Sequence, residues 1–191
     1  PPSPRASLAA WDVAVIGGTG FIGAHVVSAL RDAGYTVGVM ARRIANPDPA
    51  FRDDGVALIA GDARRRADVE RAVGAARYVV NLAHGGAAAP QDVGPAMLAA
   101  TQTVAEVCIE RKVERLVHLG SIASLYLGED AGAVRDDAPP DPMAHARSPY
   151  ARAKAETDSL LRALSQSHTL PLVLLRPGLV VGAGASAFHS G

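Results

Sequence analysis

Short apolar runs alternate along the chain with stretches whose apolar residues recur at helical spacing. The first run is DVAVIG from Asp12, after which Phe21, Val26 and Leu30 follow a helical period until Gly34. Five further runs are YTVGVMAR, VALIAGD, RYVVNLAH, VERLVHLGS and LPLVLLRPG. Helices are expected through Val69, Ala72 and Val73, over roughly 92–111, and over about 148–167. Continuous apolar strands separated by helices indicate a parallel sheet covered on both faces. Right-handed connections make this a doubly wound α/β fold of about six strands.

Composition limits the kind of partner. The chain has 191 residues, 49% of them hydrophobic, which is enough for one domain with a buried core. Its 19 Lys and Arg residues balance 19 Asp and Glu residues, so no net charge favours nucleic acid or an anionic membrane. The single cysteine, Cys108, excludes an internal disulfide and is expected on the buried side of a helix. With no membrane-spanning run and no signal-peptide pattern, we expect a cytoplasmic protein that binds a small molecule.

Three glycines, Gly17, Gly20 and Gly23, lie where the first strand gives way to the first helix. Gly17 would allow the tight turn, Gly20 a close approach of backbone to phosphate, and Gly23 packing of the helix against the sheet. The amides and the positive helix end would then hold a diphosphate. We expect residues 1–10 to form a flexible lead and 11–191 a dinucleotide-binding domain.

The ends of the second and third strands bear on the choice of dinucleotide. Arg42 and Arg43 follow the second strand, and guanidinium groups there suit a 2′-phosphate, so NADP is favoured over NAD, which stays possible. Arginines at a strand end are also often solvated caps. Asp62, after the third strand, is placed either to accept from the adenine amino group or to cap the next helix.

The stretch SPYARAKAE sets Tyr150 and Lys154 four residues apart, on one face of a helix. A phenol has an unperturbed pKa near ~10, and a nearby ammonium favours its phenolate, which brings it toward acid–base work at neutral pH. Ser121, at the end of the fifth strand, is expected to hold a substrate oxygen. Ser124 is the fallback for that role, although ordinary loop polarity explains it as well. The spacing of histidines and carboxylates predicts no metal site.

Taken together, GGTGFIG, GD, NLAH, VHLGS, SPYARAK and RPGLVVG resemble the short-chain dehydrogenase/reductase superfamily, in its extended or NAD-dependent epimerase/dehydratase branch. The resemblance covers almost the whole chain and implies a Rossmann-type fold. It implies Tyr150 as general acid/base, Lys154 as its modulator and a ribose ligand, and Ser121 as the group that binds the carbonyl or hydroxyl. The cofactor-binding residues that it implies are Gly17, Thr19, Gly20, Phe21, Ile22, Gly23, Arg42, Arg43, Asp62, Ala63, Leu82, Ala83, His84, Lys154 and Pro177.

The sequence also departs from the family pattern. Sugar dehydratases of this family carry an Asp-Glu pair after their serine or threonine, whereas Ile122 and Ala123 stand here, which disfavours a dehydratase. Met97 occupies the position of the usual relay asparagine, and Gly120 replaces the first of two serines. The chain stops at Gly191, where extended members continue into a substrate-binding lobe, so we expect a fragment.

Three functions stay open at this stage. The first is an NAD(P)-dependent oxidoreductase that interconverts a carbonyl and a secondary alcohol through Ser121, Tyr150 and Lys154. The second is an epimerase that uses the same groups without net turnover of cofactor. The third is a non-catalytic module that binds NAD(P). His84 is expected to line the nicotinamide side without a catalytic role, the loop around 127–147 to form a flap, and a homodimer is possible.

Overall fold

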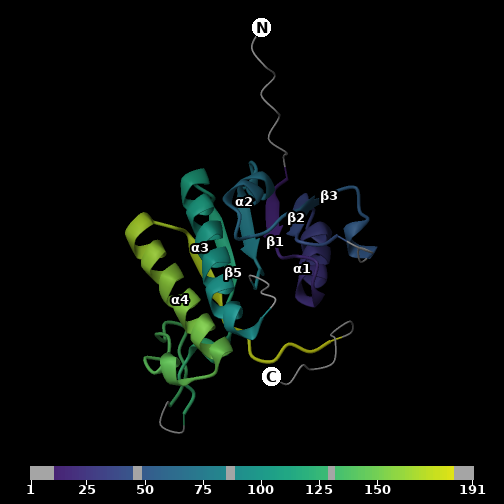
Figure 1. Cartoon of the computed structure of the whole chain (residues 1–191). Coiled ribbons are helices and arrows are strands. Elements are labelled where there is room, and N and C mark those ends of the chain that lie inside the picture. Colours follow the sequence, from purple (N-terminus) through teal and green to yellow (C-terminus); the bar gives the residue numbers. More distant parts are fainter. Residues whose placement is uncertain (1–10, 45–48, 85–88, 129–131, 183–191) are drawn as a thin grey trace.

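Figure 1 shows the computed structural model of the chain, which describes residues 11–44, 49–84, 89–128 and 132–182. The expected lead over residues 1–10 lies outside the described residues. Within them, six strands form one sheet, in which every pairing is parallel and the order is β3-β2-β1-β4-β5-β6. The strands are β1 (Val13–Ile16), β2 (Val37–Ala41), β3 (Val56–Ala60), β4 (Tyr78–Asn81), β5 (Arg115–Leu119) and β6 (Leu172–Leu175). This confirms the doubly wound, Rossmann-type α/β prediction.

In the described part of the chain, four α-helices connect the strands, together with short 3-10 turns. They are α1 (Phe21–Asp32), α2 (Arg66–Val73), α3 (Val93–Arg111) and α4 (Pro149–His168). The 3-10 turns are η1 (Pro49–Phe51), η2 (Pro90–Asp92), η3 (Ile122–Ser124) and η4 (Ala144–Ala146). Each helix agrees with a stretch of helical spacing in the sequence, because its apolar residues recur on the side that faces the sheet.

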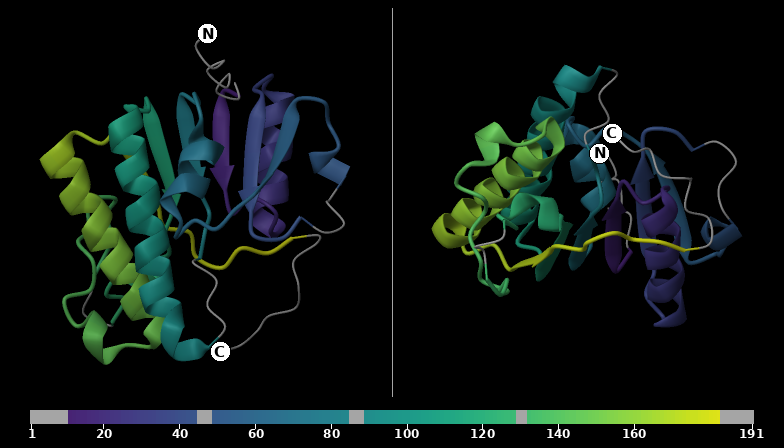
Figure 2. Two further views of the ribbon diagram at one scale, coloured as in Figure 1. Left: turned by 45° about the horizontal axis from the view of Figure 1, so that its top comes forward. Right: turned by 90° about the horizontal axis from the view of Figure 1, so that it is seen from below.

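The helices cover the two faces of the sheet unequally. Figure 2 shows α2, α3 and α4 on one face and α1 on the other. One core cluster includes Ile16, Val69, Val104 and Leu161 and lies under the three helices, whereas a second cluster around Val15 and Val27 lies under α1. Cys108 is buried in the larger cluster, as expected, and burial raises the pKa of its thiol to about 12. The thiol therefore stays protonated and has no role in the chemistry proposed below.

The amino-terminal edge of the sheet is closed by Trp11, the single tryptophan of the chain. Its indole nitrogen donates to the Ala72 carbonyl oxygen at 2.9 Å. The ring lies over Gly38 of β2 so closely that a Cβ at this position would come within 2.3 Å of it. Gly38 is therefore required by the indole, and Trp11 ties β2 to α2 at the end of the sheet away from the loops that follow the strands.

Candidate functional site

Every segment that the sequence singles out lies at the carboxyl edge of the sheet. The glycine turn follows β1, Arg42 and Arg43 follow β2, Asp62 and Ala63 follow β3, Leu82, Ala83 and His84 follow β4, Ser121 follows β5, and Pro177 follows β6. Tyr150 and Lys154 come from the first turns of α4. The chain after β6 runs along this edge below the strands, as Figure 2 shows from below. Open parallel sheets bind their ligands at this edge.

The turn between β1 and α1 depends on glycine at several positions. Gly17 has a φ of +78°, and a Cβ there would lie 2.8 Å from the backbone of Ala83. A Cβ at Gly23 would lie 2.0 Å from the carbonyl oxygen of Gly18. The Gly18 carbonyl lies directly beside the first turn of α1, and Gly23 lets the helix come this close to the glycine turn. The sequence predicted instead that Gly23 allows the helix to pack against the sheet.

Gly20 serves a different purpose. It is the N-cap of α1, with extended backbone angles, and nothing lies within 4 Å of the position that its Cβ would take. The helix has no side-chain cap and no acidic residue in its first turn. No side chain of the described residues caps the first amides of α1, so these amides and the positive end of the helix can bind an anionic ligand. These residues fit the diphosphate of a dinucleotide, with Thr19 exposed beside Gly20 and with Phe21 and Ile22 half-buried behind it.

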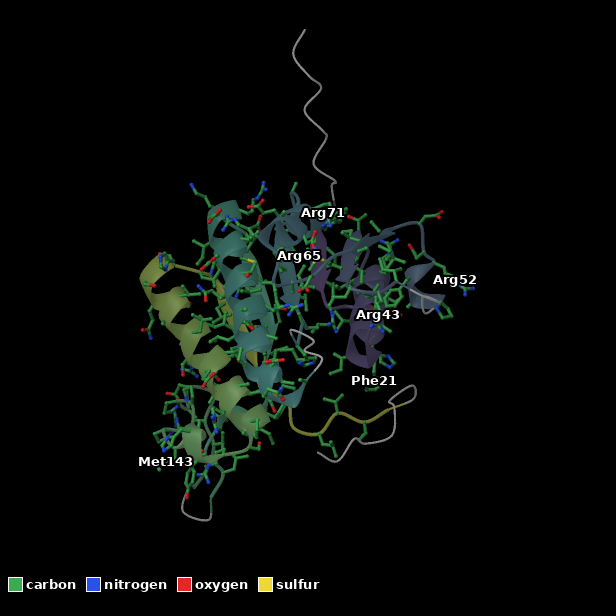
Figure 3. All side chains as sticks on the ribbon, viewed as in Figure 1. Phe21, Arg43, Arg52, Arg65, Arg71 and Met143 are labelled. Carbon is green, nitrogen blue, oxygen red and sulfur yellow. The ribbon has the colours of Figure 1, made fainter. Side chains whose placement is uncertain are left out.

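Beyond β2 and β3 the structure places a charged surface. Arg42 and Arg43 are exposed, and Figure 3 labels Arg43 near the lower end of the sheet, above Phe21. The Asp62 carboxylate accepts hydrogen bonds from Arg64. Arg64 Nη2 donates to Asp62 Oδ2 at 2.6 Å, and the Arg64 backbone amide donates to Asp62 Oδ1. These hydrogen bonds hold the pKa of Asp62 below its usual range, and Arg42 acts in the same direction. Asp62 does not cap α2, because the N-cap is Arg65; that alternative is wrong.

Tyr150 and Lys154 meet on one face of α4, as their spacing predicts. Lys154 Nζ lies 5.8 Å from the centre of the Tyr150 ring. Lys154 is 2% exposed, whereas Tyr150 is 46% exposed in the first turn of α4. The Lys154 ammonium donates to the Leu119 carbonyl oxygen at 3.2 Å. Burial lowers the pKa of Lys154 to about 8, so the group remains mostly protonated at neutral pH.

Ser121 opens the turn after β5. Its hydroxyl oxygen accepts from the Ala123 amide at 3.1 Å, and among the described residues no acceptor takes the hydroxyl proton, which can therefore be donated to a ligand. The Ile122 amide donates to the Pro177 carbonyl oxygen at 3.1 Å, so the turn after β5 and the chain after β6 are joined. Ser124 is 1% exposed and turned inward, away from any substrate. The fallback role of Ser124 as a substrate ligand is therefore not supported by its burial.

Two histidines lie behind Lys154. His118 is buried, and its Nδ1 lies 3.2 Å from Asn81 Nδ2, while Asn81 Oδ1 accepts from the Ala83 amide. Burial, followed by the charge of Lys154, lowers the pKa of His118 to about 3. His84 is exposed along one side, yet enough protein surrounds it that lost hydration, and then the charge of Lys154, lower its pKa to about 4. Both rings are neutral at neutral pH, and Lys154 is the cation of this group.

Several polar residues that support this site were not predicted from the sequence. Asn81 and His118 are polar residues at or near the ends of two apolar strands, a signal that could have drawn attention to them. Asp158 and Arg176 form a buried pair; Arg176 begins the RPGLVVG motif but was given no role there, and Asp158 lies outside the quoted motifs. Met97 is 2% exposed on α3 and has no proton to donate. Among the described residues, no group of three His, Cys, Asp or Glu could hold a metal ion, and none of the helices could cross a membrane.

A parallel sheet with a glycine turn after β1 and a Tyr-Lys pair at its carboxyl edge defines a dinucleotide-dependent class of protein. Comparison with known families makes this more specific. Residues 13–191 match the family described as NAD dependent epimerase/dehydratase family. The chain belongs to this family.

Individual relatives agree with this assignment. The chain is 30% identical over 182 residues to a UDP-glucose 4-epimerase of Azospirillum brasilense, a match that covers 90% of this chain and 49% of that protein. Among solved structures, it is similar to a UDP-glucose 4-epimerase of Thermus thermophilus in complex with NAD, with 30% identity, a TM-score of 0.69, and coverage of 86% of this chain and 54% of that one. A dTDP-glucose 4,6-dehydratase of Streptomyces venezuelae has 25% identity and a TM-score of 0.72, over 86% and 54% of the two chains. The chain thus spans about half the length of the relatives that it matches.

Proposed function

We propose that this chain carries the dinucleotide site and the acid–base residues of a nucleotide-sugar epimerase. In this reaction a secondary alcohol on the sugar is oxidised and the resulting carbonyl is reduced again from the other face. A bound nicotinamide would supply the acceptor and donor of hydride. The relatives named above favour this alternative over the net oxidoreductase that the sequence analysis placed first.

The observation that carries the proposal is the pairing of Tyr150 with Lys154 at the edge where the glycine turn lies. The phenol is exposed at the site, so it can take the proton from a sugar hydroxyl and return it. The buried ammonium nearby favours the phenolate while it forms. The hydroxyl proton of Ser121 is available to hold the reacting oxygen in place. The roles of these three residues are therefore general base, its modulator, and substrate positioning.

A net dehydrogenase or reductase is the second candidate, supported by the same three residues. The residues of the turn after β5 favour either of these two functions over a dehydratase. Ile122 and Ala123 have no ionisable group, so this turn contains no acid–base pair that could eliminate water from a sugar. Dehydration would need such groups in addition to Tyr150.

The cofactor is proposed as NAD or NADP, held by the residues that the sequence analysis named. The similar epimerase of Thermus thermophilus and dehydratase of Streptomyces venezuelae are both in complex with NAD. The exposed arginines after β2, Arg42 and Arg43, instead favour a 2′-phosphate, and the preference for NADP stays a prediction. We propose Asp62 as an acceptor for the adenine amino group, with its carboxylate also accepting from Arg64.

A direct test incubates the chain with UDP-glucose and either dinucleotide, and follows formation of the 4-epimer by NMR together with absorbance of the reduced cofactor. An epimerase forms the 4-epimer without accumulating reduced cofactor. Accumulation of reduced cofactor in step with substrate loss would instead indicate the net oxidoreductase. Binding of dinucleotide without any turnover would favour the third reading, a non-catalytic module.

A further inference from the structure

Asp158 is a buried carboxylate one turn beyond Lys154 on α4, only 2% exposed, with no place in the chemistry described above. Its oxygens accept from two arginines. Arg176 donates through Nε at 2.7 Å and through Nη2 at 3.0 Å, and Arg162 donates through Nε at 2.7 Å. A buried ion pair of this kind is weak evidence for stability, because desolvation offsets much of the attraction. What these hydrogen bonds do provide is a fixed position for the Asp158 carboxylate and the two arginines.

One side of Asp158 reaches the turn that holds Ser121. The Ser124 hydroxyl oxygen lies 3.2 Å from Asp158 Oδ2 and 2.8 Å from the Ser121 carbonyl oxygen, so its single proton is shared between these acceptors. The Ser124 amide also donates to the Ser121 carbonyl oxygen, at 3.1 Å. Ser124 is thus a bridge between the buried carboxylate and the backbone of Ser121.

The other side of Asp158 reaches the chain after β6. Arg176 is held by two hydrogen bonds to the carboxylate and directly precedes Pro177. The Pro177 carbonyl oxygen accepts from the Ile122 amide, in the same turn that begins at Ser121. The two segments that flank the nicotinamide end of the proposed site are therefore fastened to each other and to one carboxylate.

Arg162 differs from Arg176 in what it holds. Its Nη2 donates to the Ala138 carbonyl oxygen at 3.0 Å, so it connects α4 with the loop that contains Ala138. Within the described part of the chain, the hydrogen-bond partners of Arg162 are Asp158 and Ala138, and neither lies in the turn after β5 or the chain after β6. Arg162 thus offers a matched control, because it shares Asp158 with Arg176 but does not adjoin Ser121 or Pro177.

We propose that Asp158 is a positioning residue that sets Ser121 and Pro177 relative to each other, through Ser124 and Arg176. The proposal rests on the proposed function, because it assigns these two segments to the nicotinamide half of a bound dinucleotide. The adenosine half, at the ends of β2 and β3, has no connection to Asp158. Loss of the carboxylate should therefore affect one half of the ligand only.

The experiment compares two ligands by calorimetry. One is NADH or NADPH, whichever the wild-type chain binds more tightly; the other is the matching fragment without nicotinamide, ADP-ribose or 2′-phospho-ADP-ribose. We expect Asp158→Asn and Ser124→Ala each to weaken dinucleotide binding about tenfold, the effect of one displaced hydrogen bond, and to leave fragment binding within about twofold. Arg162→Gln should change neither. The double variant should lose no more than Asp158→Asn alone, because both act through one connection.

The outcomes separate the two proposals. If the wild-type chain binds neither ligand, the proposed function is wrong and this inference is wrong with it. If the wild-type chain binds both, but the variants weaken both ligands equally or neither, only the role of Asp158 is overturned. Should Asp158→Asn fail to fold, because two arginines then lack their charge partner, Ser124→Ala decides, since it removes one hydroxyl and leaves both ion pairs intact.

Discussion

The ammonium of Lys154 donates a hydrogen bond to the carbonyl oxygen of Leu119, the last residue of β5, at 3.2 Å. This bond fixes the first turns of α4 against the strand that leads to Ser121. It also keeps a cation in a position from which water is largely excluded. The residue that the proposed chemistry needs is therefore one that the fold holds at an energetic cost.

Lys154→Met should stabilise the fold at neutral pH while it removes activity. Burial lowers the pKa of Lys154 from 10.5 to about 8, which corresponds to at most about 3 kcal/mol. Because the folded pKa lies below the unfolded one, the cost is fully present below pH 8 and is relieved as the pH rises toward 10.5. Urea unfolding should show the variant more stable at pH 7, with the difference shrinking by pH 10. If the difference in free energy of unfolding between the variant and wild type were the same at pH 7 and pH 10, the lowered pKa of Lys154 would be wrong.

Tyr150→Phe should remove turnover and leave dinucleotide binding intact. The phenol is 46% exposed, and loss of its hydroxyl removes no hydrogen bond that the fold uses among the described contacts. Loss of a general acid–base group lowers the rate roughly 10²- to 10⁴-fold. The epimerisation assay and a calorimetric titration measure the two effects separately. Turnover that survives this substitution would remove Tyr150 from the mechanism.

Gly20→Ala should fold normally and lose dinucleotide binding. The backbone at Gly20 has a φ of −82° and a ψ of 178°, which any residue adopts, and its Cβ would meet nothing within 4 Å. The added methyl group would instead occupy the space proposed for the diphosphate. Gly94→Ala, at the second residue of α3 and with only an ordinary contact at 3.7 Å, is the matched control and should leave dinucleotide binding unchanged. Unchanged binding in Gly20→Ala would place the diphosphate elsewhere.

Arg42→Ala should reduce the affinity for NADPH more than the affinity for NADH. A charge-assisted hydrogen bond to the 2′-phosphate contributes about 1.5–3 kcal/mol, so the loss should be at least about tenfold for NADPH alone. Fluorescence titration with both cofactors measures it, and Arg43→Ala extends the test to the second arginine. If wild type binds NADH as tightly as NADPH, the preference for NADP is wrong.

The fold could be predicted from the sequence because its signals are local. Residues 13–16 and 37–41 are continuous apolar runs, and the intervening helix shows its period over 12 residues. The glycine turn and the Tyr150-Lys154 pair are equally local, since four residues on one helix must share a face. The role of Asp62 was harder to predict, because both a helix cap and a ligand contact fit its position in the sequence. Its hydrogen bonds to the Arg64 side chain depend on a side-chain rotamer, which the sequence does not show.

The supporting residues of the site could not be predicted in this way. Asp158 is 34 residues from Ser124 and 18 from Arg176, so nothing in its own neighbourhood indicates those partners. The same holds for Asn81 and His118, which are 37 residues apart and meet only because β4 pairs with β5. Such contacts follow from strand order, which the periodicity of the sequence does not give.

Trp11 provides an optical consequence of the fold. The chain's single indole lies before the start of β1, packed on Gly38 and bonded to Ala72, whereas the glycine turn begins where β1 ends. Its fluorescence therefore reports whether the amino-terminal edge is assembled, whereas Gly20 and Arg42 follow β1 and β2 at the opposite edge of the sheet. Nicotinamide emission would monitor the opposite edge. Unfolding and ligand occupancy can thus be recorded in one cuvette, at two wavelengths, without a label.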